Sequence, residues 1–326
     1  MNGTKEIPIT EIEGFRLGHA WDQEAATGCS VILCDHCSPA GAAVRGGGPA
    51  SRETPLLDPL AASLGLHAIL LSGGSAFGLD AAGGVMKYLE ERDIGFDVGV
   101  TKVPLVCQSC VFDLVIGRKD VRPDSEMAYK ACLDADSCKD SALLQGNVGV
   151  GMGCTVGKYK GPEYAMKGGL GTFALQAGNV KVGAIVAVNA MGDIYNIETG
   201  RQIAGLLNKE KNGFRCTEEE MVKDAAAIPD LFTGNTTIGV ILTNGAFTKA
   251  QANKIAAMAH NGYARSIRPV HTTADGDTIY ALSLGKEKAD LNVVGTLAAY
   301  VMGMAVNRGV LAAQSAHGYL GAKDLL

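Results

Sequence analysis

The sequence has few aromatic residues, few charges and no excess of basic residues. Phe, Trp and Tyr make up 6% of the 326 residues, charged residues make up 19%, and the formal net charge is −5. A chain without a basic surplus is not expected to bind nucleic acid. The N-terminal stretch MNGTKEIPITEIEG contains neither a basic nor an apolar segment. We therefore predict no signal peptide and a cytoplasmic location.

Long hydrophobic runs are also scarce. The most apolar late segment is LNVVGTLAAYVMGMAVNRGVLAA. Only about fifteen residues separate Asn292 from Asn307 within it, too few for a helix that crosses a bilayer. We therefore predict a buried C-terminal helix and no membrane partner.

The nine cysteines are an odd number in a chain without an export signal, so we expect reduced thiols. Two C-x-x-C pairs, Cys34 with Cys37 and Cys107 with Cys110, have the spacing of a four-thiolate zinc site. Cys34, however, ends the alternating, strand-like run CSVILC, and free cysteine is common in protein cores. The core interpretation is favoured, and we expect no metal or other cofactor.

A hydrophobic content of 47% and 43 glycines indicate a globular chain with a large core and many tight turns. Apolar runs predict strands, several of them buried on both faces, at CSVILC, HAILLSG, VKVGAIVAVNA, TTIGVILTN and DTIYALSLG. Helices are predicted at SAFGLDAAGGVMKYLEERD, PDSEMAYKACLDAD, TEEEMVKDAAAI and TKAQANKIAAMAHNG. This intermixing predicts the α/β (α+β) class with a layered core. Residues 1–326 show no composition break and are expected to form a single domain.

Two of the predicted helices begin with capping boxes, Thr217 with Glu220 and Thr248 with Gln251. The region from residue 198 to residue 235 is more charged and polar than the apolar strands on either side of it. We predict a surface excursion that ends in a mobile loop, where a break in the chain would be tolerated.

Glycine-rich stretches suggest binding of small groups. LLSGGSAFGLDAAGG follows a predicted strand and opens a helix, which is typical of an anion cradle, but it lacks the glycine patterns of nucleotide-binding loops. Ser75 within it lacks the spacing of a nucleophile elbow, so a helix N-cap is favoured. In QGNVGVGMG, Gly149 is a candidate substrate-binding residue, because glycines there either let backbone NH groups line a pocket or merely permit turns.

Several polar residues allow both a structural and a functional interpretation. Asp275 and Asp277 follow His271 and flank a glycine. In a turn their carboxylates would be solvated, whereas in a strand they would point to the same side and face one site. Asn189 ends an apolar strand and either starts a turn or donates to an oxyanion. Lys158 is a lone cation in a glycine-rich loop, where solvent exposure is more common.

The stretch GNTTIGVILTN places Gly234 and Asn235 before a strand that begins with Thr236 and Thr237. Threonine is common at the start of a strand. A self-cleaving enzyme would also place its nucleophile there. Taken alone, the stretch favours the first interpretation.

Seven motifs, in order along the chain, carry a resemblance. They are GFRLGHAWDQEAATGCSVIL, VRGGGPASRETPLLDP, HAILLSGGSAFGLDAAGGVMKYLEER, QGNVGVGMG, VNAMGDI, GNTTIGVILTN and RPVHTTADGDTIYAL. Together they resemble the DmpA-like peptidase family, which includes L-aminopeptidase/D-esterase-amidases, β-aminopeptidases and the nylon-oligomer endohydrolase. The resemblance extends from about Ile7 to Gly318.

The resemblance implies an αββα sandwich similar to that of N-terminal-nucleophile hydrolases. It also implies autoproteolysis between Asn235 and Thr236 into chains 1–235 and 236–326, with Thr236 as the new N-terminus. A freed α-amino group has a pKa of about 8, so it can supply the base that a weakly nucleophilic hydroxyl needs. Gly234 would let the backbone adopt a strained conformation before cleavage.

By the same resemblance, Asp275 and Asp277 would orient and polarise Thr236. Asn189 matches the oxyanion-binding asparagine of the family. Lys158 matches a lysine of the nylon-hydrolase branch that would depress the α-amino pKa and stabilise negative charge.

The resemblance implies that Thr236 hydrolyses small peptides or amino-acid amides without a metal. Phe112, a candidate substrate-binding residue, stands where several members carry Tyr, so one hydroxyl donor would be missing. The Asn-Thr junction, the aspartates and Lys158 also leave open a linear oligoamide (6-aminohexanoate oligomer) endohydrolase. An alternative from another class is a non-catalytic small-anion-binding protein. Family members form tetramers or larger assemblies, so we expect a homo-oligomer.

Overall fold

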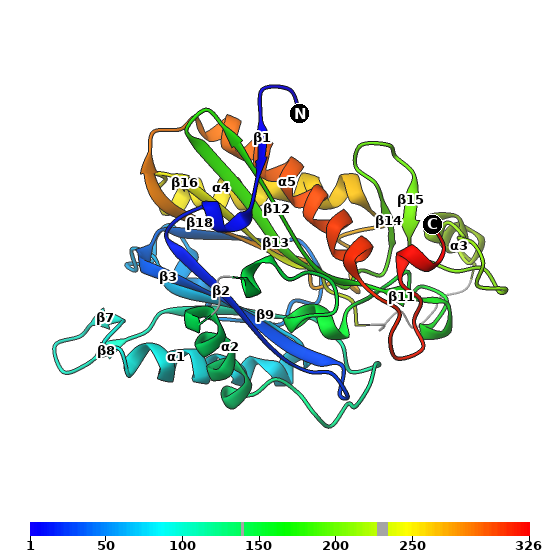
Figure 1. The fold of residues 1–326 in the computed structure, drawn as a ribbon, viewed down its shortest axis with the longest axis horizontal. Coiled ribbons are helices and arrows are strands. Elements are labelled where there is room, and N and C mark those ends of the chain that lie inside the picture. The colour runs from blue at the N-terminus through cyan, green and yellow to red at the C-terminus, as the bar shows by residue number, and fades with distance from the viewer. Residues whose placement is uncertain (138–139, 227–233) are drawn as a thin grey trace.

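The chain folds into four layers in the order helix, sheet, sheet, helix (Figure 1). The computed structural model describes residues 1–137, 140–226 and 234–326. Two mixed β-sheets pack face to face, and each has a pair of helices on its outer face. This arrangement confirms the predicted α/β class and the αββα sandwich.

The first sheet has six strands and carries the C-terminal helices. Its order is β1 (Lys5–Ile7), β12 (Gly169–Ala177), β13 (Val180–Val188), β16 (Ile238–Gly245), β18 (Thr278–Glu287) and β4 (Ala40–Val44). All its pairs are antiparallel except β16 with β18, which is parallel. Helices α4 (Lys249–Ser266) and α5 (Leu291–Ala312) cover its outer face.

The second sheet has five strands, in the order β2 (Phe15–Asp22), β3 (Thr27–Ser38), β6 (Leu66–Ser72), β9 (Val106–Cys110) and β5 (Ser51–Arg52). Helices α1 (Ala82–Glu90) and α2 (Ser125–Ser137) pack against it. Smaller sheets join β7 (Phe96–Asp97) with β8 (Lys102–Val103), β10 (Thr155–Val156) with β11 (Met166–Lys167), and β14 (Asp193–Tyr195) with β15 (Gln202–Ala204) and β17 (Ile267–Arg268). Short 3-10 helices include η3 (Ser75–Ala81) and η5 (Gly149–Gly153), and α3 spans Thr217–Lys223.

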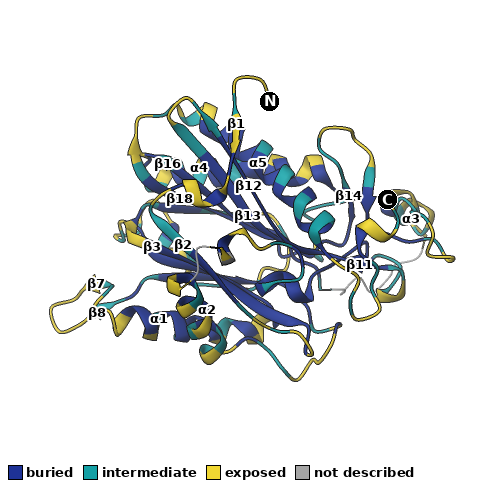
Figure 2. Cartoon of the chain, viewed as in Figure 1, coloured by how far each residue is buried: buried dark blue, intermediate teal, exposed yellow. Residues whose placement is uncertain are grey.

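Three apolar clusters fill the spaces between the four layers, and Figure 2 shows the buried strands at the centre. One cluster lies between the sheets and one lies beneath each helical layer. The central strands are therefore apolar on both faces, and every residue of β6 is buried. This is why the sequence shows continuous apolar runs rather than alternation.

Helix α5 confirms the prediction of a buried C-terminal helix, but it is longer than predicted. It spans 22 residues and is apolar enough to cross a membrane, yet 72% of its most apolar window is buried inside the protein. Asn307, which was expected to limit the apolar segment, lies within the helix. Its side chain donates to the Tyr195 carbonyl at 2.8 Å and accepts from the Ile197 amide at 2.9 Å. These hydrogen bonds allow a buried asparagine within an apolar helix.

One of the two predicted capping boxes forms. Thr248 and Gln251 cap α4 reciprocally, as predicted. Thr217 does not cap α3, because its hydroxyl donates to buried Asp193 at 2.8 Å. The hydroxyl of Thr217 therefore bonds to Asp193, distant in sequence, instead of capping its own helix.

The predicted surface excursion is only partly correct. The region from 198 to 226 contains β15, which pairs with β14, and the Asp193 carboxylate accepts from the Thr217 amide at the start of α3. These contacts hold the region to the body of the protein. Residues 227–233, where the mobile loop was predicted, lie outside the described residues.

Candidate active site

The parallel pairing of β16 with β18 brings the predicted nucleophile next to the predicted aspartates. Ile238 is opposite Thr278, and an isolated bridge ahead of the strands sets Asn235 opposite Asp275. Because the amino ends of parallel strands lie at the same edge of a sheet, two segments 40 residues apart meet here. A Cβ on the glycine between the aspartates, Gly276, would lie 2.6 Å from Thr236 Oγ1, so only glycine leaves room for that hydroxyl.

The Asn235 carbonyl, the one that self-cleavage would attack, accepts two hydrogen bonds. The Gly276 amide donates to it at 2.9 Å, and the Thr236 hydroxyl also donates to it. The Thr236 amide in turn donates to the Asn189 carbonyl at 2.9 Å. The peptide bond is thus fixed on both sides, with its carbonyl polarised by a backbone N–H.

Asn189 links this peptide to Lys158 and Phe112. It follows β13, which is antiparallel to β16 and sets Ala187 opposite Ile238. Its Oδ1 accepts from Lys158 Nζ at 2.9 Å, and its Nδ2 donates to the Phe112 carbonyl at 3.0 Å. The amide predicted to bind an oxyanion is therefore engaged with Phe112 in the continuous chain.

Lys158 is buried rather than solvated, being 6% exposed. The loop that carries it runs beside the end of β13, where the Lys158 amide donates to the Met191 carbonyl at 3.0 Å. Its Nζ donates to both oxygens of Asn189, the backbone one at 3.2 Å. The solvent-exposed interpretation of this lysine is therefore wrong.

The two aspartates are buried and have different donors. Asp277 Oδ1 accepts from the Thr237 amide at 2.8 Å, and its Oδ2 accepts from the amide and from Nδ1 of His271 at 3.1 and 2.9 Å. Asp275 Oδ2 accepts from the amide and hydroxyl of Thr272 at 2.9 and 2.6 Å. The solvated-turn interpretation is wrong, because these carboxylates are 1% and 2% exposed.

Burial changes the protonation of the charged groups at this site. Burial lowers the pKa of Lys158 to about 7, although nearby carboxylates and Cys154 oppose that shift. Burial, and then the charge of Asp277, raise the pKa of Asp275 to about 6, because two close carboxylates resist ionising together. Groups that titrate near neutral pH are suited to proton transfer.

A small cavity of about 80 Å³ adjoins the Asn235–Thr236 peptide bond. Its lining residues are small or uncharged, namely Gly48, Ala50, Ser75, Cys110, Phe112, Gly234, Asn235, Thr236, Thr273 and Ala274. Phe112 packs so closely on Gly234 that a Cβ there would lie 2.1 Å from the ring. The structure therefore places Phe112 in the cavity lining and gives Gly234 a packing role next to the junction.

Ser75 belongs to this cavity lining, which the sequence did not indicate. It is the first residue of η3 and has a φ of 53°, a left-handed conformation that non-glycine residues rarely adopt. Its hydroxyl forms no helix cap, so the predicted N-cap is wrong. Such strained residues often occur at functional sites.

The predicted anion cradle at the start of η3 is filled by groups of the chain itself. Gly74 N donates to the buried Asp113 carboxylate at 2.7 Å. The amides before and after it, Gly73 N and Ser75 N, donate to backbone carbonyls at 2.9 Å. These amides are not available for an external anion, which argues against a binding protein that uses this loop.

Gly149, a predicted substrate-binding residue, is not part of the cavity lining. It begins η5, and a Cβ on it would lie 2.3 Å from Ser30 Oγ of β3. Its φ of 51° and this close approach both require glycine. Its role in the fold is therefore packing and turning.

The two C-x-x-C pairs lie on different strands, β3 and β9, with β6 between them. Cys34, Cys107 and Cys110 are buried, and burial raises the pKa of each thiol to about 12. Within residues 1–137, 140–226 and 234–326, no group of three or more His, Cys, Asp or Glu side chains could hold a metal ion. These residues do not fit a four-thiolate zinc site.

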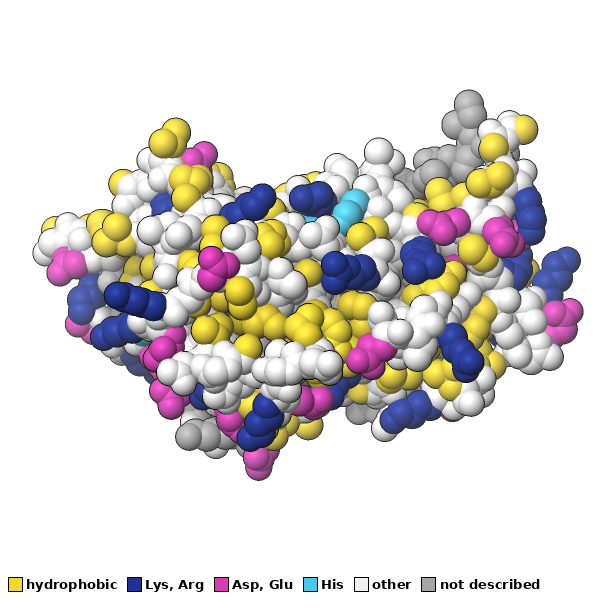
Figure 3. Space-filling model, turned by 90° about the horizontal axis from the view of Figure 1, so that it is seen from above, with side chains coloured by type: hydrophobic (Ala, Val, Ile, Leu, Met, Phe, Trp, Pro, Cys, Tyr) yellow, Lys and Arg dark blue, Asp and Glu magenta, His cyan; other side chains and the backbone are white. Residues whose placement is uncertain are grey.

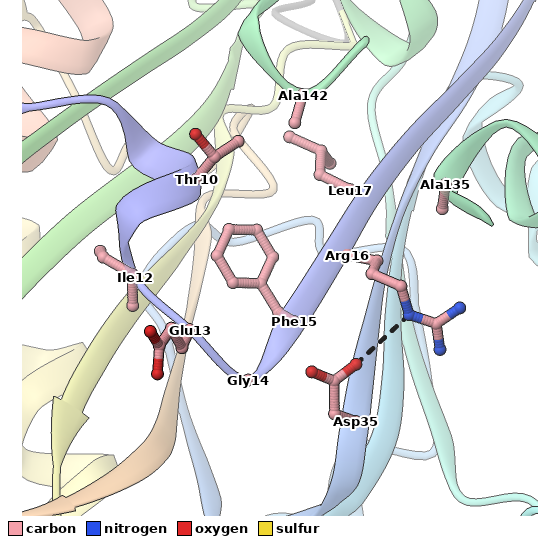
Figure 4. A pocket seen from close by; sticks show the side chains of 10 residues that line it. All are labelled: Thr10, Ile12, Glu13, Gly14, Phe15, Arg16, Leu17, Asp35, Ala135 and Ala142. Carbon is pink, nitrogen blue, oxygen red and sulfur yellow. Dashed lines mark hydrogen bonds and ion pairs between the residues drawn. The ribbon is translucent and has the colours of Figure 1, made fainter. Parts of the chain in front are cut away.

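A larger cavity of about 340 Å³ lies elsewhere, along residues 10–17 at the start of β2 (Figure 4). Arg16 in its lining pairs with Asp35 at 3.3 Å, and Phe15 occupies the middle of the view. Its lining contains no lysine or histidine that could act as a base beside a nucleophile. We therefore assign the candidate site to the smaller cavity at Thr236.

Comparison with known proteins identifies the family of this chain. The model of peptidase family S58 matches residues 8–323. An uncharacterized aminopeptidase of Mycobacterium tuberculosis (strain H37Rv) is 37% identical, with 97% of each chain covered. A 6-aminohexanoate-oligomer endohydrolase of Agromyces sp. is 27% identical, with 93% of this chain and 85% of the relative covered.

Two solved structures share the fold at low sequence identity. An L-aminopeptidase D-Ala-esterase/amidase of Ochrobactrum anthropi, described as a variant of the Ntn hydrolase fold, has a TM-score of 0.70 and 17% identity over 97% of this chain and 90% of that chain. A Burkholderia sp. β-aminopeptidase has a TM-score of 0.65 and 18% identity over 98% and 93%. The chain therefore belongs to peptidase family S58, the DmpA-like family, and is a hydrolase of peptide or amide bonds.

Proposed function

We propose that the protein cleaves itself between Asn235 and Thr236 and then uses Thr236 as an N-terminal nucleophile. The observation that carries this proposal is the fixed geometry of that peptide bond. The Thr236 hydroxyl contacts the Asn235 carbonyl, and the Gly276 amide polarises the same oxygen from 2.9 Å. A backbone donor at a reacting carbonyl stabilises the charge that develops there.

Self-cleavage would proceed through an ester. The Thr236 hydroxyl adds to the Asn235 carbonyl carbon, the bond from that carbon to Thr236 nitrogen breaks, and the hydroxyl proton passes to the nitrogen. Water then hydrolyses the ester, which leaves a carboxylate on Asn235 and a free amine on Thr236. Asp275 is placed to exchange the proton, because its backbone is opposite Asn235 and its pKa is raised to about 6.

The mature enzyme would repeat this chemistry on a substrate. The acyl group of the substrate transfers to the Thr236 hydroxyl, and its C–N bond breaks as the departing amine takes up the hydroxyl proton. Water, activated by the Thr236 α-amine, then hydrolyses the ester and releases the acid. Lys158 would stabilise negative charge in the intermediate through Asn189, which it contacts at 2.9 Å. Asn189 Nδ2, which Phe112 holds in the continuous chain, would become the oxyanion donor once the junction has opened.

The size and lining of the cavity favour a substrate with a small, neutral acyl group. It measures about 80 Å³, and none of its described lining residues carries a charge. We therefore propose small peptides and amino-acid amides as substrates. Phe112 would contact the acyl group, because its ring lies against Gly234 at the junction.

A linear oligoamide endohydrolase is the second candidate. Asn235, Thr236, the aspartate pair and buried Lys158 together favour it, and relatives named 6-aminohexanoate-oligomer endohydrolase cover nearly the whole chain. Rates on alanine p-nitroanilide and on 6-aminohexanoate oligomers separate the two candidates. If a chain with a free Thr236 amine turns over neither, both substrate proposals are wrong.

The test of the nucleophile is a pair of variants, one that keeps the shape of the side chain and one that keeps its hydroxyl. Thr236→Val should remain a single chain and lose hydrolysis, whereas Thr236→Ser should process and retain activity. A processed, active Thr236→Val protein would contradict the proposal.

We also propose a homo-oligomer. Figure 3 looks onto the face that carries α4 and α5 and shows a band of hydrophobic side chains across its middle. Met258, Tyr300 and Met304 of these helices are only partly buried in the single chain. Light scattering of the purified protein measures the assembly directly, and a monomeric mass would contradict this expectation.

A further inference from the structure

The proposed function does not explain the contacts of His271. This residue has a φ of 60°, so its backbone is held in the left-handed region. Both its backbone N and its ring Nδ1 donate to the same oxygen of Asp277, at 3.1 and 2.9 Å. A strained histidine with two donors on one buried carboxylate is an unusual arrangement for packing alone.

The two aspartates of the site differ in their donors. Asp277 accepts three N–H donors, two from His271 and one from Thr237. Asp275 accepts two donors from Thr272, both at Oδ2. More donors stabilise the charged form of a carboxylate, so the pair is asymmetric and Asp277 is the favoured anion.

The surroundings of His271 favour donation from Nδ1. Its ring packs edge-on against His260 at 4.7 Å and lies 6.2 Å from the Tyr263 ring, and its side chain is 17% exposed. Its Nε2 is buried and has no hydrogen-bond partner in the described part of the chain. With Asp277 as acceptor, Nδ1 carries the proton and the ring orientation is fixed.

The other charged and titratable groups near this pair are accounted for. His260 bonds to the Ala43 carbonyl at 2.9 Å, and burial lowers the pKa of His260 to about 4, so it stays neutral. Burial raises the pKa of Tyr263 well above its usual value. The charge of exposed Arg45 lowers the pKa of His260, and the Arg45 backbone N donates to the Asp277 carbonyl at 2.9 Å. His271 is therefore the side chain that donates to Asp277.

We propose that His271 is a positioning residue for the reaction: its Nδ1–H holds Asp277 as the fixed anion of the pair, so that the exchangeable proton resides on Asp275, opposite the scissile residue. The inference rests on the proposed function of Thr236. It gives Asp277 the fixed charge and Asp275 the exchangeable proton, a distinction that the spacing of the two residues does not make.

The test is a set of His271 variants in the full-length chain, assayed for self-cleavage rate and for kcat and KM on alanine p-nitroanilide. Asn places an N–H donor close to the position of Nδ1, and it tolerates a positive φ. His271→Asn should keep kcat within about threefold of the wild type, whereas His271→Gly should lower kcat and the self-cleavage rate by about 10- to 100-fold at unchanged KM. Gly relieves the strained backbone but provides no donor.

Two further variants keep the proposal falsifiable if the Gly variant does not fold. His271→Gln has a donor one methylene too far along the side chain, so it should be impaired like the Gly variant. His260→Gln, which preserves the bond to the Ala43 carbonyl, should stay within about twofold of the wild type and is the matched control. Thermal unfolding of each variant separates lost folding from lost positioning.

The outcomes are distinct. If the wild type neither processes nor hydrolyses, the function proposed for Thr236 is wrong. If the wild type is active and the Gly and Gln variants match it, only the role of His271 is overturned. Equal loss in the Asn and Gln variants would also overturn it, because the donor at Nδ1 would then not be the property that matters.

Discussion

Two lysines of this protein are buried to a similar degree, and only one of them lies beside the reacting groups. Lys167 Nζ donates to the carbonyls of Gly151, Cys154 and Gly168 at 3.3, 2.8 and 3.2 Å. Lys158 Nζ donates to Asn189, which contacts Thr236. Burial lowers the pKa of Lys158 to about 7 and that of Lys167 to about 8.

The difference lies in the groups that each lysine contacts. Both Asn189 oxygens have a second donor, Thr236 N for the backbone oxygen and Thr155 N for Oδ1. Lys167 instead contacts three backbone carbonyls, and those of Gly151 and Cys154 also have a second donor, Cys154 N at 3.3 Å and Gly168 N at 2.9 Å. A lowered pKa is therefore insufficient evidence of catalysis, and the neighbouring groups decide between a chemical and a structural lysine.

The largest effect is expected from removing the nucleophile, since without it neither lysine has chemistry to support. Thr236→Val should abolish self-cleavage and hydrolysis. Thr237→Val is the matched control. The Thr237 hydroxyl has no hydrogen-bond partner within the described residues, and the variant keeps the hydrogen bond from the Thr237 amide to Asp277. Electrophoresis under denaturing conditions should show one band for the first variant and two for the second. The reverse pattern would assign the nucleophile to Thr237.

The second prediction compares the lysines directly. Lys158→Met should lower the rates of self-cleavage and hydrolysis by roughly 10²- to 10³-fold, the loss typical of a group that stabilises a developing charge. Its thermal unfolding should change little. Lys167→Met should lower the free energy of unfolding by about 1–3 kcal/mol, because three buried carbonyls each lose the hydrogen bond from its ammonium group, while the rates persist. If Lys158→Met lost stability and Lys167→Met lost activity, the assignment of a chemical role to Lys158 and a structural role to Lys167 would be wrong.

The third prediction concerns the glycine between the aspartates. Gly276→Ala would place a Cβ 2.6 Å from Thr236 Oγ1 and should slow self-cleavage by up to about 10²-fold through misplacement of the hydroxyl. Gly48→Ala in the same cavity is the control, since its Cβ would approach Asp275 O only to 3.8 Å. Timed electrophoresis after rapid purification gives both rates, and equal rates would show that the hydroxyl tolerates the displacement.

The smallest effect is the dependence on pH. As pH rises through about 7, Lys158 loses its proton in the folded enzyme, so the hydrolysis rate should halve near that pH and keep falling. Its folded pKa lies below the unfolded value of 10.5, so the unfolded state binds more protons between these values and stability should rise there.

Rates and unfolding temperatures measured from pH 6 to 9 test both trends in one series. Lys167→Met should keep the alkaline loss of activity and show a shallower rise in stability. If that variant removes the alkaline limb of the rate profile, the limb belongs to Lys167 and not to Lys158.

Much of the fold could be predicted from the sequence, because burial on both faces leaves continuous apolar runs such as that of β6. The Thr248 cap was also predictable, since its partner Gln251 lies three residues away. The absence of a cap at Thr217 was not predictable, because its hydroxyl donates instead to Asp193, which is distant in sequence. The length of α5 could not be predicted either, because the partners of Asn307 are Tyr195, at the end of β14, and Ile197 just after it.

The site residues were predicted from a resemblance of motifs, and their arrangement comes from topology. Nothing local indicates that Asn235 lies opposite Asp275, because that pairing depends on the parallel register of β16 and β18. Ser75 was missed because it follows β6 of the other sheet, and only the packing of the two sheets brings it to the cavity at Thr236. His271 stands six residues before Asp277, and only its backbone conformation turns the ring onto that carboxylate.

Self-activation of the chain at Thr236 can be measured from the intact mass of the purified wild-type protein. We expect two species, residues 1–235 and 236–326, whose masses sum to that of the full chain plus one water. N-terminal sequencing of the smaller species should begin Thr-Thr-Ile-Gly. A single species of 33.7 kDa that persists while the protein hydrolyses its substrate would contradict self-activation at Thr236.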